Sequence, residues 1–150
     1  MKKNNKGFTL IELLAVIVVL AIIMVIATTQ INRTIRKSRA NSFYDSVQMI
    51  ERNAEMLCAQ DNEITESELA ELSDIEHDGN DITDEDYGIS ISGSSVTVTA
   101  KGQFANVALT DYYHTGDSGK GDKVKNSITS VAEHSMTFTA DCSKTTSAAQ

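Results

Sequence analysis

The residues whose types could support catalysis are few and scattered. His77, His114 and His134 stand singly, no serine or cysteine stands in a nucleophile motif, and neither a CxxC nor an HxxxH pair occurs. A catalytic triad needs a base positioned beside its nucleophile, and a structural zinc site needs clustered cysteine or histidine ligands. The sequence therefore favours binding or assembly over an enzyme.

One acidic stretch could hold a cation. Asp74, Glu76, Asp78, Gly79 and Glu85 occupy positions 1, 3, 5, 6 and 12 of an EF-hand-like loop, and carboxylate oxygens are the ligands that calcium prefers. The pattern is flawed, because position 3 is glutamate and an alternating, strand-like stretch follows in place of an exit helix. A weak calcium site on Asp74, Asp78 and Glu85 is one interpretation, and a solvated acidic loop without a cofactor is the other.

The two cysteines, Cys58 and Cys142, lie far apart in the sequence. Such a pair predicts one disulfide in a domain outside the cell, or two buried thiols otherwise. A disulfide between them would close a loop of roughly 80 residues and would stabilise the fold by about 4 kcal/mol in the chain-entropy estimate.

A further carboxylate, Glu12, stands inside an apolar stretch near the amino terminus. Residues 8–27 are twenty residues long, and all of them except Thr9 and Glu12 are apolar. As a helix this stretch would be about 30 Å long, the thickness of a bilayer's hydrocarbon core. A carboxylate within a membrane segment costs roughly 2.5–3.5 kcal/mol, so it usually has a partner and a function.

Two ordinary interpretations of this amino terminus are open. The basic "MKKNNK", the apolar stretch and a Val25-x-Ala27 pair fit a secretory signal with a small-residue cleavage site. A plain single-pass membrane anchor is the other interpretation, and hydropathy alone favours it because the apolar stretch is long for a signal core. Both leave Glu12 as a tolerated charge near a helix end.

The segment "KGFTLIELL", residues 6–14, resembles the processing motif of type IV prepilins. The resemblance rests on a short basic leader that ends in Gly7, on Phe8 as the first mature residue, and on Glu12 five residues into the mature chain. It implies that a prepilin peptidase cleaves between Gly7 and Phe8 and methylates the new amino group of Phe8. It also implies that the mature subunit passes from the membrane into a helical filament.

The resemblance further implies a role for Glu12, partners and a location. Glu12 would neutralise the amino terminus of a neighbouring subunit and so fix the register between helices. The subunit would span the bacterial cell membrane once before assembly and would lie in an extracellular pilus afterwards, with its own copies and other pilins as partners. Such pili serve adhesion, twitching motility or secretion. The alternatives are a pseudopilin of a type II secretion or DNA-uptake system, and a membrane-tethered or secreted acidic binding domain.

Charge is divided unevenly along the chain. Residues 1–39 hold seven Lys or Arg and one acidic residue, whereas residues 40–150 hold six Lys or Arg against twenty Asp or Glu, a net charge of about −14. So acidic a surface repels phosphate backbones, and we expect no nucleic acid to bind it. The basic patch from Arg33 to Arg39 predicts contact with acidic surfaces of adjacent subunits or with lipid headgroups, or else a solvated helix face.

The apolar pattern continues past the membrane stretch as an amphipathic helix, so we expect one helix over residues 8–60. The chain departs from the resemblance at Thr29, where the best-known pilins often carry a helix-breaking proline; it has no proline, so we expect a helix with fewer sharp kinks. The expected domains are a leader at 1–7, a transmembrane and filament-core helix at 8–27, an amphipathic half at 28–60 and an acidic head at 61–150. The apolar stripe of the second half comprises Ile31, Ile35, Phe43, Val47, Ile50, Ala54 and Leu57.

The head is expected to combine one short helix with a small sheet. In "TESELAEL", Thr65 as N-cap with Glu68 three residues on predicts the helix. "YGISISGSSVTVTA" predicts a β-hairpin, "QFANVALTDYY" a third strand, and "SITSVAEHSMTFTADC" one or two more strands. The fold class is therefore α+β, a long amino-terminal helix packed on a small antiparallel sheet, which is the pilin-like fold that the resemblance implies.

Overall fold

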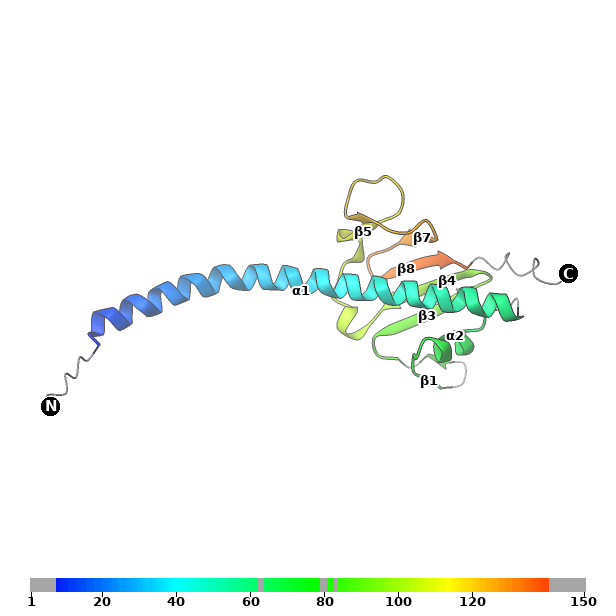
Figure 1. Cartoon of the computed structure of the whole chain (residues 1–150), viewed down its shortest axis with the longest axis horizontal. Coiled ribbons are helices and arrows are strands. Elements are labelled where there is room, and N and C mark those ends of the chain that lie inside the picture. The colour runs from blue at the N-terminus through cyan, green and yellow to red at the C-terminus, as the bar shows by residue number, and fades with distance from the viewer. Residues whose placement is uncertain (1–7, 62–63, 79–80, 83, 141–150) are drawn as a thin grey trace, which may run out of the picture. The chain divides into compact units, whose positions relative to one another are not determined.

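The computed structural model describes four stretches of the chain, residues 8–61, 64–78, 81–82 and 84–140. The chain divides into two compact units, Met1–Arg36 and Lys37–Gln150. Helix α1 (Leu10–Asp61) is a single helix, as the sequence predicts (Figure 1). We call the second unit the head.

The other elements of the head are short, and most of them are strands (Figure 1). In chain order they are α2 (Glu66–Leu72), β1 (His77–Asp78), β2 (Asp81–Ile82), β3 (Tyr87–Ser92), β4 (Ser95–Ala100), the 3₁₀ turns η1 (Gly102–Phe104) and η2 (Leu109–Asp111), β5 (Tyr113–His114), β6 (Asp122–Lys123), β7 (Ile128–Val131) and β8 (Ser135–Thr139).

The main sheet has four strands in the order β3-β4-β8-β7, and every neighbouring pair is antiparallel. The predicted hairpin is confirmed, with Ile89 opposite Val98 and Ile91 opposite Val96. Gly93, at the turn, has φ of 62°, a conformation that glycine adopts at no steric cost. Together with α1 this sheet confirms the expected α+β layout. The parallel pair β5–β6 is an addition that the sequence did not predict.

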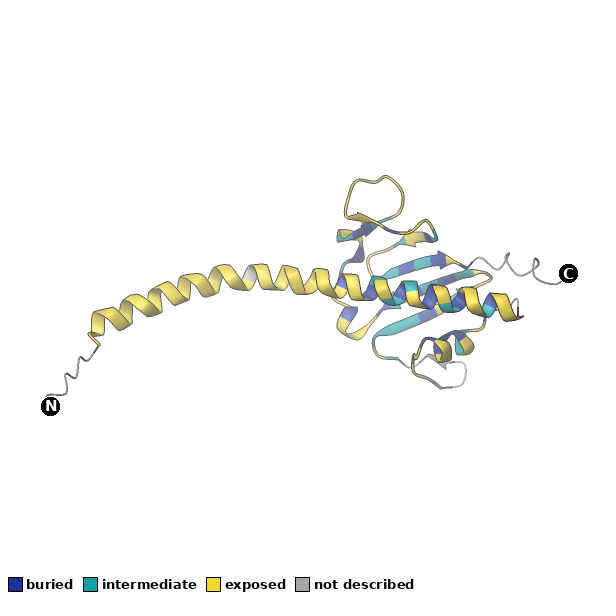
Figure 2. Cartoon of the chain, viewed as in Figure 1, coloured by how far each residue is buried: buried dark blue, intermediate teal, exposed yellow. Residues whose placement is uncertain are grey.

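The core of the head lies between one face of this sheet and the part of α1 that follows Lys37 (Figure 2). Within α1 the buried positions recur at three, four or seven residues, so they form one stripe. Alternate residues of β4 and β8 face that stripe, as the two-residue period of a strand requires. The buried residues of these three elements are Ala40, Phe43, Val47, Ile50, Ala54, Cys58, Val96, Val98, Ala100, Met136 and Phe138.

Ile31 and Ile35, the first two residues of the predicted stripe, lie in the first unit and are exposed. One expectation about the head is wrong. The predicted third strand is instead the turns η1 and η2, which bury Phe104 and Leu109 at a spacing that no single strand face can satisfy. Apolar content was therefore a correct guide to burial here, but not to local conformation.

Helix α2 begins as predicted. The N–H of Glu68 donates to Oγ1 of its N-cap Thr65 at 3.4 Å, and that hydroxyl donates to Glu68 Oε2 at 2.5 Å. After its last residue the chain turns through Asp74, which has φ of 55°. Asn53 of α1 donates through Nδ2 to the carbonyl of Leu72 and to Ser73 Oγ, at 3.1 Å each. These two bonds attach the end of α2 to α1.

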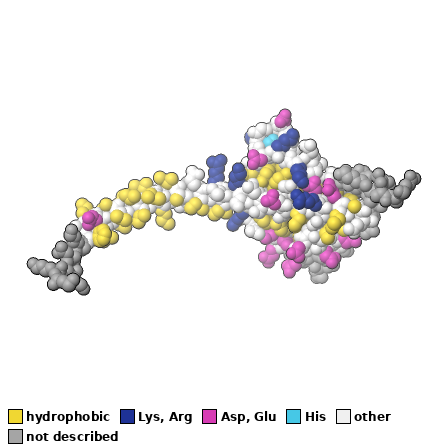
Figure 3. Space-filling view, viewed as in Figure 1, with side chains coloured by type: hydrophobic (Ala, Val, Ile, Leu, Met, Phe, Trp, Pro, Cys, Tyr) yellow, Lys and Arg dark blue, Asp and Glu magenta, His cyan; other side chains and the backbone are white. Residues whose placement is uncertain are grey.

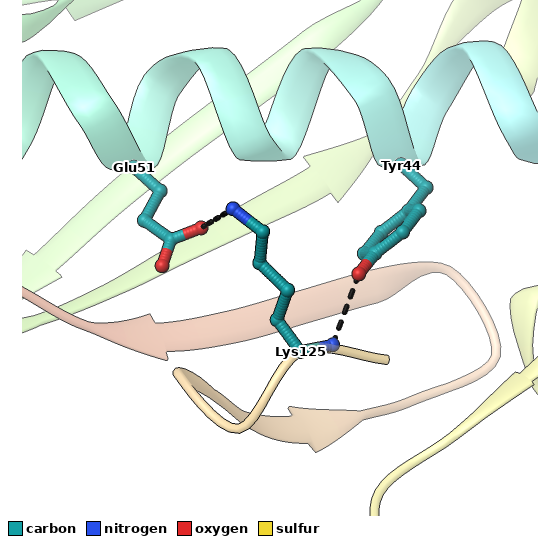
Figure 4. A network of polar contacts seen from close by, with 3 residues as sticks. All are labelled: Tyr44, Glu51 and Lys125. Carbon is teal, nitrogen blue, oxygen red and sulfur yellow. Dashed lines mark hydrogen bonds and ion pairs between the residues drawn. The ribbon is translucent and has the colours of Figure 1, made fainter. Parts of the chain in front are cut away.

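A buried acidic residue connects α1 to the segment before β7 (Figure 4). Glu51 is 4% exposed, and its Oε2 lies 3.9 Å from Nζ of Lys125. The backbone N–H of Lys125 donates to the hydroxyl of Tyr44 at 3.0 Å. A buried carboxylate is tolerated only with a compensating partner, which Lys125 supplies from its half-exposed position.

Candidate assembly site

Glu12 lies in the first turn of α1 and closes a capping box with Thr9. Its Oε2 accepts the backbone N–H of Thr9 at 2.9 Å and the Thr9 hydroxyl at 2.8 Å. In return the N–H of Glu12 donates to Thr9 Oγ1 at 3.4 Å. Reciprocal bonds of this kind satisfy amide groups that the start of a helix leaves without a partner. Glu12 therefore orders the helix start within its own chain.

The box leaves Glu12 able to bind a second group. Both bonds to Thr9 reach the same oxygen, Oε2, while a carboxylate has about four acceptor sites on its two oxygens. The remaining acceptor sites of the carboxylate can receive an ammonium group while Oε2 keeps its bonds to Thr9. The geometry thus suits the intermolecular role that the resemblance implies. The spacing Thr9-x-x-Glu12 is a capping-box signature and could have revealed Thr9 from the sequence.

The apolar side chains that follow Glu12 are exposed throughout the first turns of α1 (Figure 2). By length and composition, α1 is the one helix in the described part of the chain that could cross a membrane. The candidate span begins at Leu10, and none of its most apolar window is buried within the chain. So much apolar surface requires lipid or other helices around it.

The other predicted site residues are distributed as follows. Phe8 is exposed just ahead of the capping box, whereas Gly7 lies outside the described residues. Cys58 is buried on α1 in the head, and Cys142 lies outside the described residues, so the disulfide between them stays a prediction.

The acidic loop folds differently from an EF-hand loop. Asp78 belongs to β1, which pairs with β2 in an antiparallel ladder, and Glu85 directly precedes strand β3. The described residues contain no group of three side chains arranged to hold a metal ion. A calcium site on Asp74, Asp78 and Glu85 stays a prediction.

The comparison with known families agrees with this amino-terminal site. Residues 2–28 match the family described as the prokaryotic N-terminal methylation motif, which is the leader of type IV prepilins. The chain thus carries the leader motif of type IV prepilins, and this motif supports a pilin-like or pseudopilin substrate of prepilin peptidase. Neither a curated protein nor a solved structure matches the chain.

Proposed function

We propose that the chain is the structural subunit of a type IV pilus. Prepilin peptidase cleaves it between Gly7 and Phe8 and methylates Phe8, and the mature subunits polymerise through the first half of α1. The observation that carries this proposal is the position of Glu12, a capped carboxylate at the start of an uncovered apolar helix that lies within the methylation motif.

The apolar segment explains why assembly and membrane insertion are alternatives. Exposing such a segment to water is unfavourable by about 25 cal/mol for each Å² of apolar surface. Lipid covers it before assembly, and the helices of neighbouring subunits cover it in the filament. Extracellular material is therefore polymeric, and a soluble full-length monomer that retains Phe8 would contradict the proposal.

Glu12 selects the register of each incoming subunit. Cleavage places a cation on Phe8, and both this cation and Glu12 are costly when alone in a low-dielectric core. Pairing Glu12 of one subunit with the amino group of the next removes both costs at one axial offset. The role is structural, with no reaction at the site.

The first test is the mass of the amino-terminal peptide from natively expressed protein. A chain that begins at Phe8 with one added methyl group supports the proposal. A chain that begins at Thr28 indicates a secreted domain, and one that begins at Met1 indicates a simple anchor; either result would overturn it.

The second test separates the charge of Glu12 from its capping role. Glu12→Gln keeps an oxygen that accepts the Thr9 bonds but removes the charge, whereas Thr9→Val removes the hydroxyl and keeps the charge. Breaking a buried ion pair costs roughly 3–5 kcal/mol, so Glu12→Gln should reduce sheared filaments at least about tenfold while processing continues. Thr9→Val should retain filaments. Normal filament yield from Glu12→Gln would refute the pairing.

The same leader occurs in pseudopilins, and the length of the fibre distinguishes the two classes. We expect long surface fibres in electron micrographs of cells that express the chain, which fits a pilus in adhesion or twitching motility. Short fibres confined to the cell envelope would assign the chain to a secretion or DNA-uptake pseudopilus.

A further inference from the structure

A cleft of about 360 Å³ opens on the head between α1, the end of α2 and the start of β3. Its lining is mixed. Met49 of α1 and Leu72 of α2 are 46% and 39% exposed, and Asp74 and Asp84 contribute carboxylates. Partly exposed apolar surface beside two acids suits a ligand that is itself apolar on one part and cationic on another.

The backbone orients one of the two acids, and the other occupies an uncommon backbone conformation. Asp84 Oδ1 accepts the N–H groups of Asp86 and Tyr87 at 2.6 and 3.0 Å, which fixes the orientation of this carboxylate. Asp74 has φ of 55°, in the left-handed region that glycine and asparagine favour after a helix. It also follows the carboxyl end of α2, where the helix dipole disfavours a negative charge. The left-handed turn tolerates an aspartate, but a negative charge at the carboxyl end of α2 is unfavourable unless a cation lies nearby.

The chain itself contains a segment of the matching chemistry. Ile31, Ile35 and Arg39 are spaced by four residues on α1, so they share one face, and all three are exposed. We call Ile31, Ile35 and Arg39 the neck face. Figure 3 shows Lys and Arg side chains gathered on α1 after the apolar segment, and Asp and Glu side chains on the side of the head that carries α2. Two isoleucines followed by a guanidinium complement an apolar cleft that ends in carboxylates.

The neck face does not line the cleft of its own chain. Arg39 precedes Ser46, the first residue of α1 that lines the cleft, by seven residues, about 10 Å along the helix axis. A second copy can bring the two together. A protrusion of one copy that enters a cleft elsewhere on the next is a heterologous contact, which propagates into a helical filament.

We propose that the cleft receives the neck face of a neighbouring subunit, with Ile35 against Met49 and Leu72 and with Arg39 paired to Asp74 and Asp84. This inference rests on the proposed filament function and adds a second point of register, on the head, to the one at Glu12.

A charge exchange tests the contact in the full-length, natively expressed protein. Arg39→Glu and Asp74→Lys should each lower the yield of sheared filaments about tenfold, and the double variant should recover most of the loss. Arg33→Glu makes the same change of charge outside the neck face and is the control. Adding Asp74→Lys to this variant should not restore any filament yield that it loses. Membrane insertion and processing should be normal in every variant.

A disulfide trap covers the case in which Asp74→Lys fails to fold. Ile35→Cys combined with Leu72→Cys should give a ladder of covalent multimers on mild oxidation, whereas either change alone should not. The ladder should be lost on reduction.

Each adverse result has a distinct meaning. Wild-type cells without filaments would overturn the proposed function. Wild-type filaments with neither a loss in Arg39→Glu nor a ladder would overturn the cleft contact alone. A defect of Arg39→Glu in membrane insertion would assign the neck face to lipid headgroups and would also overturn the cleft contact.

Discussion

Replacing Asp74 by glycine should stabilise the head, which is an uncommon expectation for a single substitution. Asp74 occupies the left-handed region with φ of 55° directly after α2. Its backbone N–H donates to the carbonyl of Glu71 at 3.2 Å, and this bond does not depend on the side chain. Glycine can therefore take over the turn without loss of the backbone pattern.

The expected gain follows from three contributions. An L-residue in the left-handed region costs about 1–2 kcal/mol, of which the greater freedom of unfolded glycine cancels about 0.5–1 kcal/mol. Removing a carboxylate from the carboxyl end of a helix adds about 0.3–1 kcal/mol. The sum is about 1 kcal/mol, which for a head of this size corresponds to a rise of about 4 °C in the melting temperature.

The assay is thermal denaturation of a chain that begins at Lys37, because every buried core residue in the described part of the chain lies in this unit. Glu76→Gln is the control, since it removes a charge from the same acidic segment without changing the turn. Asp74→Gly should exceed it by several degrees. An equal or lower melting temperature for Asp74→Gly would show that the turn carries no strain, and would remove one argument for the cleft contact.

Three further predictions concern the head. Gly121→Ala should destabilise it by about 1–3 kcal/mol more than Gly119→Ala, as measured by urea denaturation. Both glycines have φ near 70°, but only a methyl group at Gly121 would meet the Tyr112 carbonyl oxygen, at 2.7 Å. Burial is the main cause that raises the pKa of Tyr113 to about 12. The unfolded chain therefore loses the phenol proton of Tyr113 at a lower pH than the folded chain does. Up to about 2–3 kcal/mol of stability should be lost as the pH rises from 10 to 12. Across that pH range the midpoint of urea denaturation should fall less in Tyr113→Phe than in the control Tyr112→Phe. An equal fall in the two variants would contradict the assignment of the lost stability to Tyr113. Chelation of calcium should leave the melting temperature unchanged, and a drop would instead support the calcium site of the acidic loop.

The parts of the fold that sequence could predict are those with a local cause. The hairpin of β3 and β4 follows from strict alternation around Gly93, and α2 follows from its Thr65 cap. The prediction of a third strand was wrong because Phe104 and Leu109 are buried by the two turns η1 and η2. In the sequence, the spacing of these two residues resembles the imperfect alternation of a strand. Glu51 was not predicted to be buried, since only its pairing with distant Lys125 makes burial tolerable.

The candidate sites divide in the same way. Gly7, Phe8 and Glu12 stand in one short motif that the family match covers, and their roles in processing and assembly stay predictions from the sequence. The cleft brings together Met49, Leu72 and Asp84, whose proximity depends on how α1, α2 and β3 pack. The left-handed conformation of Asp74 also has no sequence signal, because aspartate is an ordinary residue in acidic loops.

The order of strands in the sheet sets the time at which the head can fold. Strand β8, the last of the four in sequence, lies between β4 and β7, and its Met136 and Phe138 oppose Val98 and Val96. The hairpin and α1 therefore emerge from the ribosome or from a translocation channel well before the strand that completes their core. Pairing over such sequence distances is slow. The growing chain therefore cannot complete its sheet, and can still pass through a narrow channel, until about residue 139 has emerged. A chain arrested before β8 would expose the edge of β4 to other chains, which makes late truncations prone to aggregation.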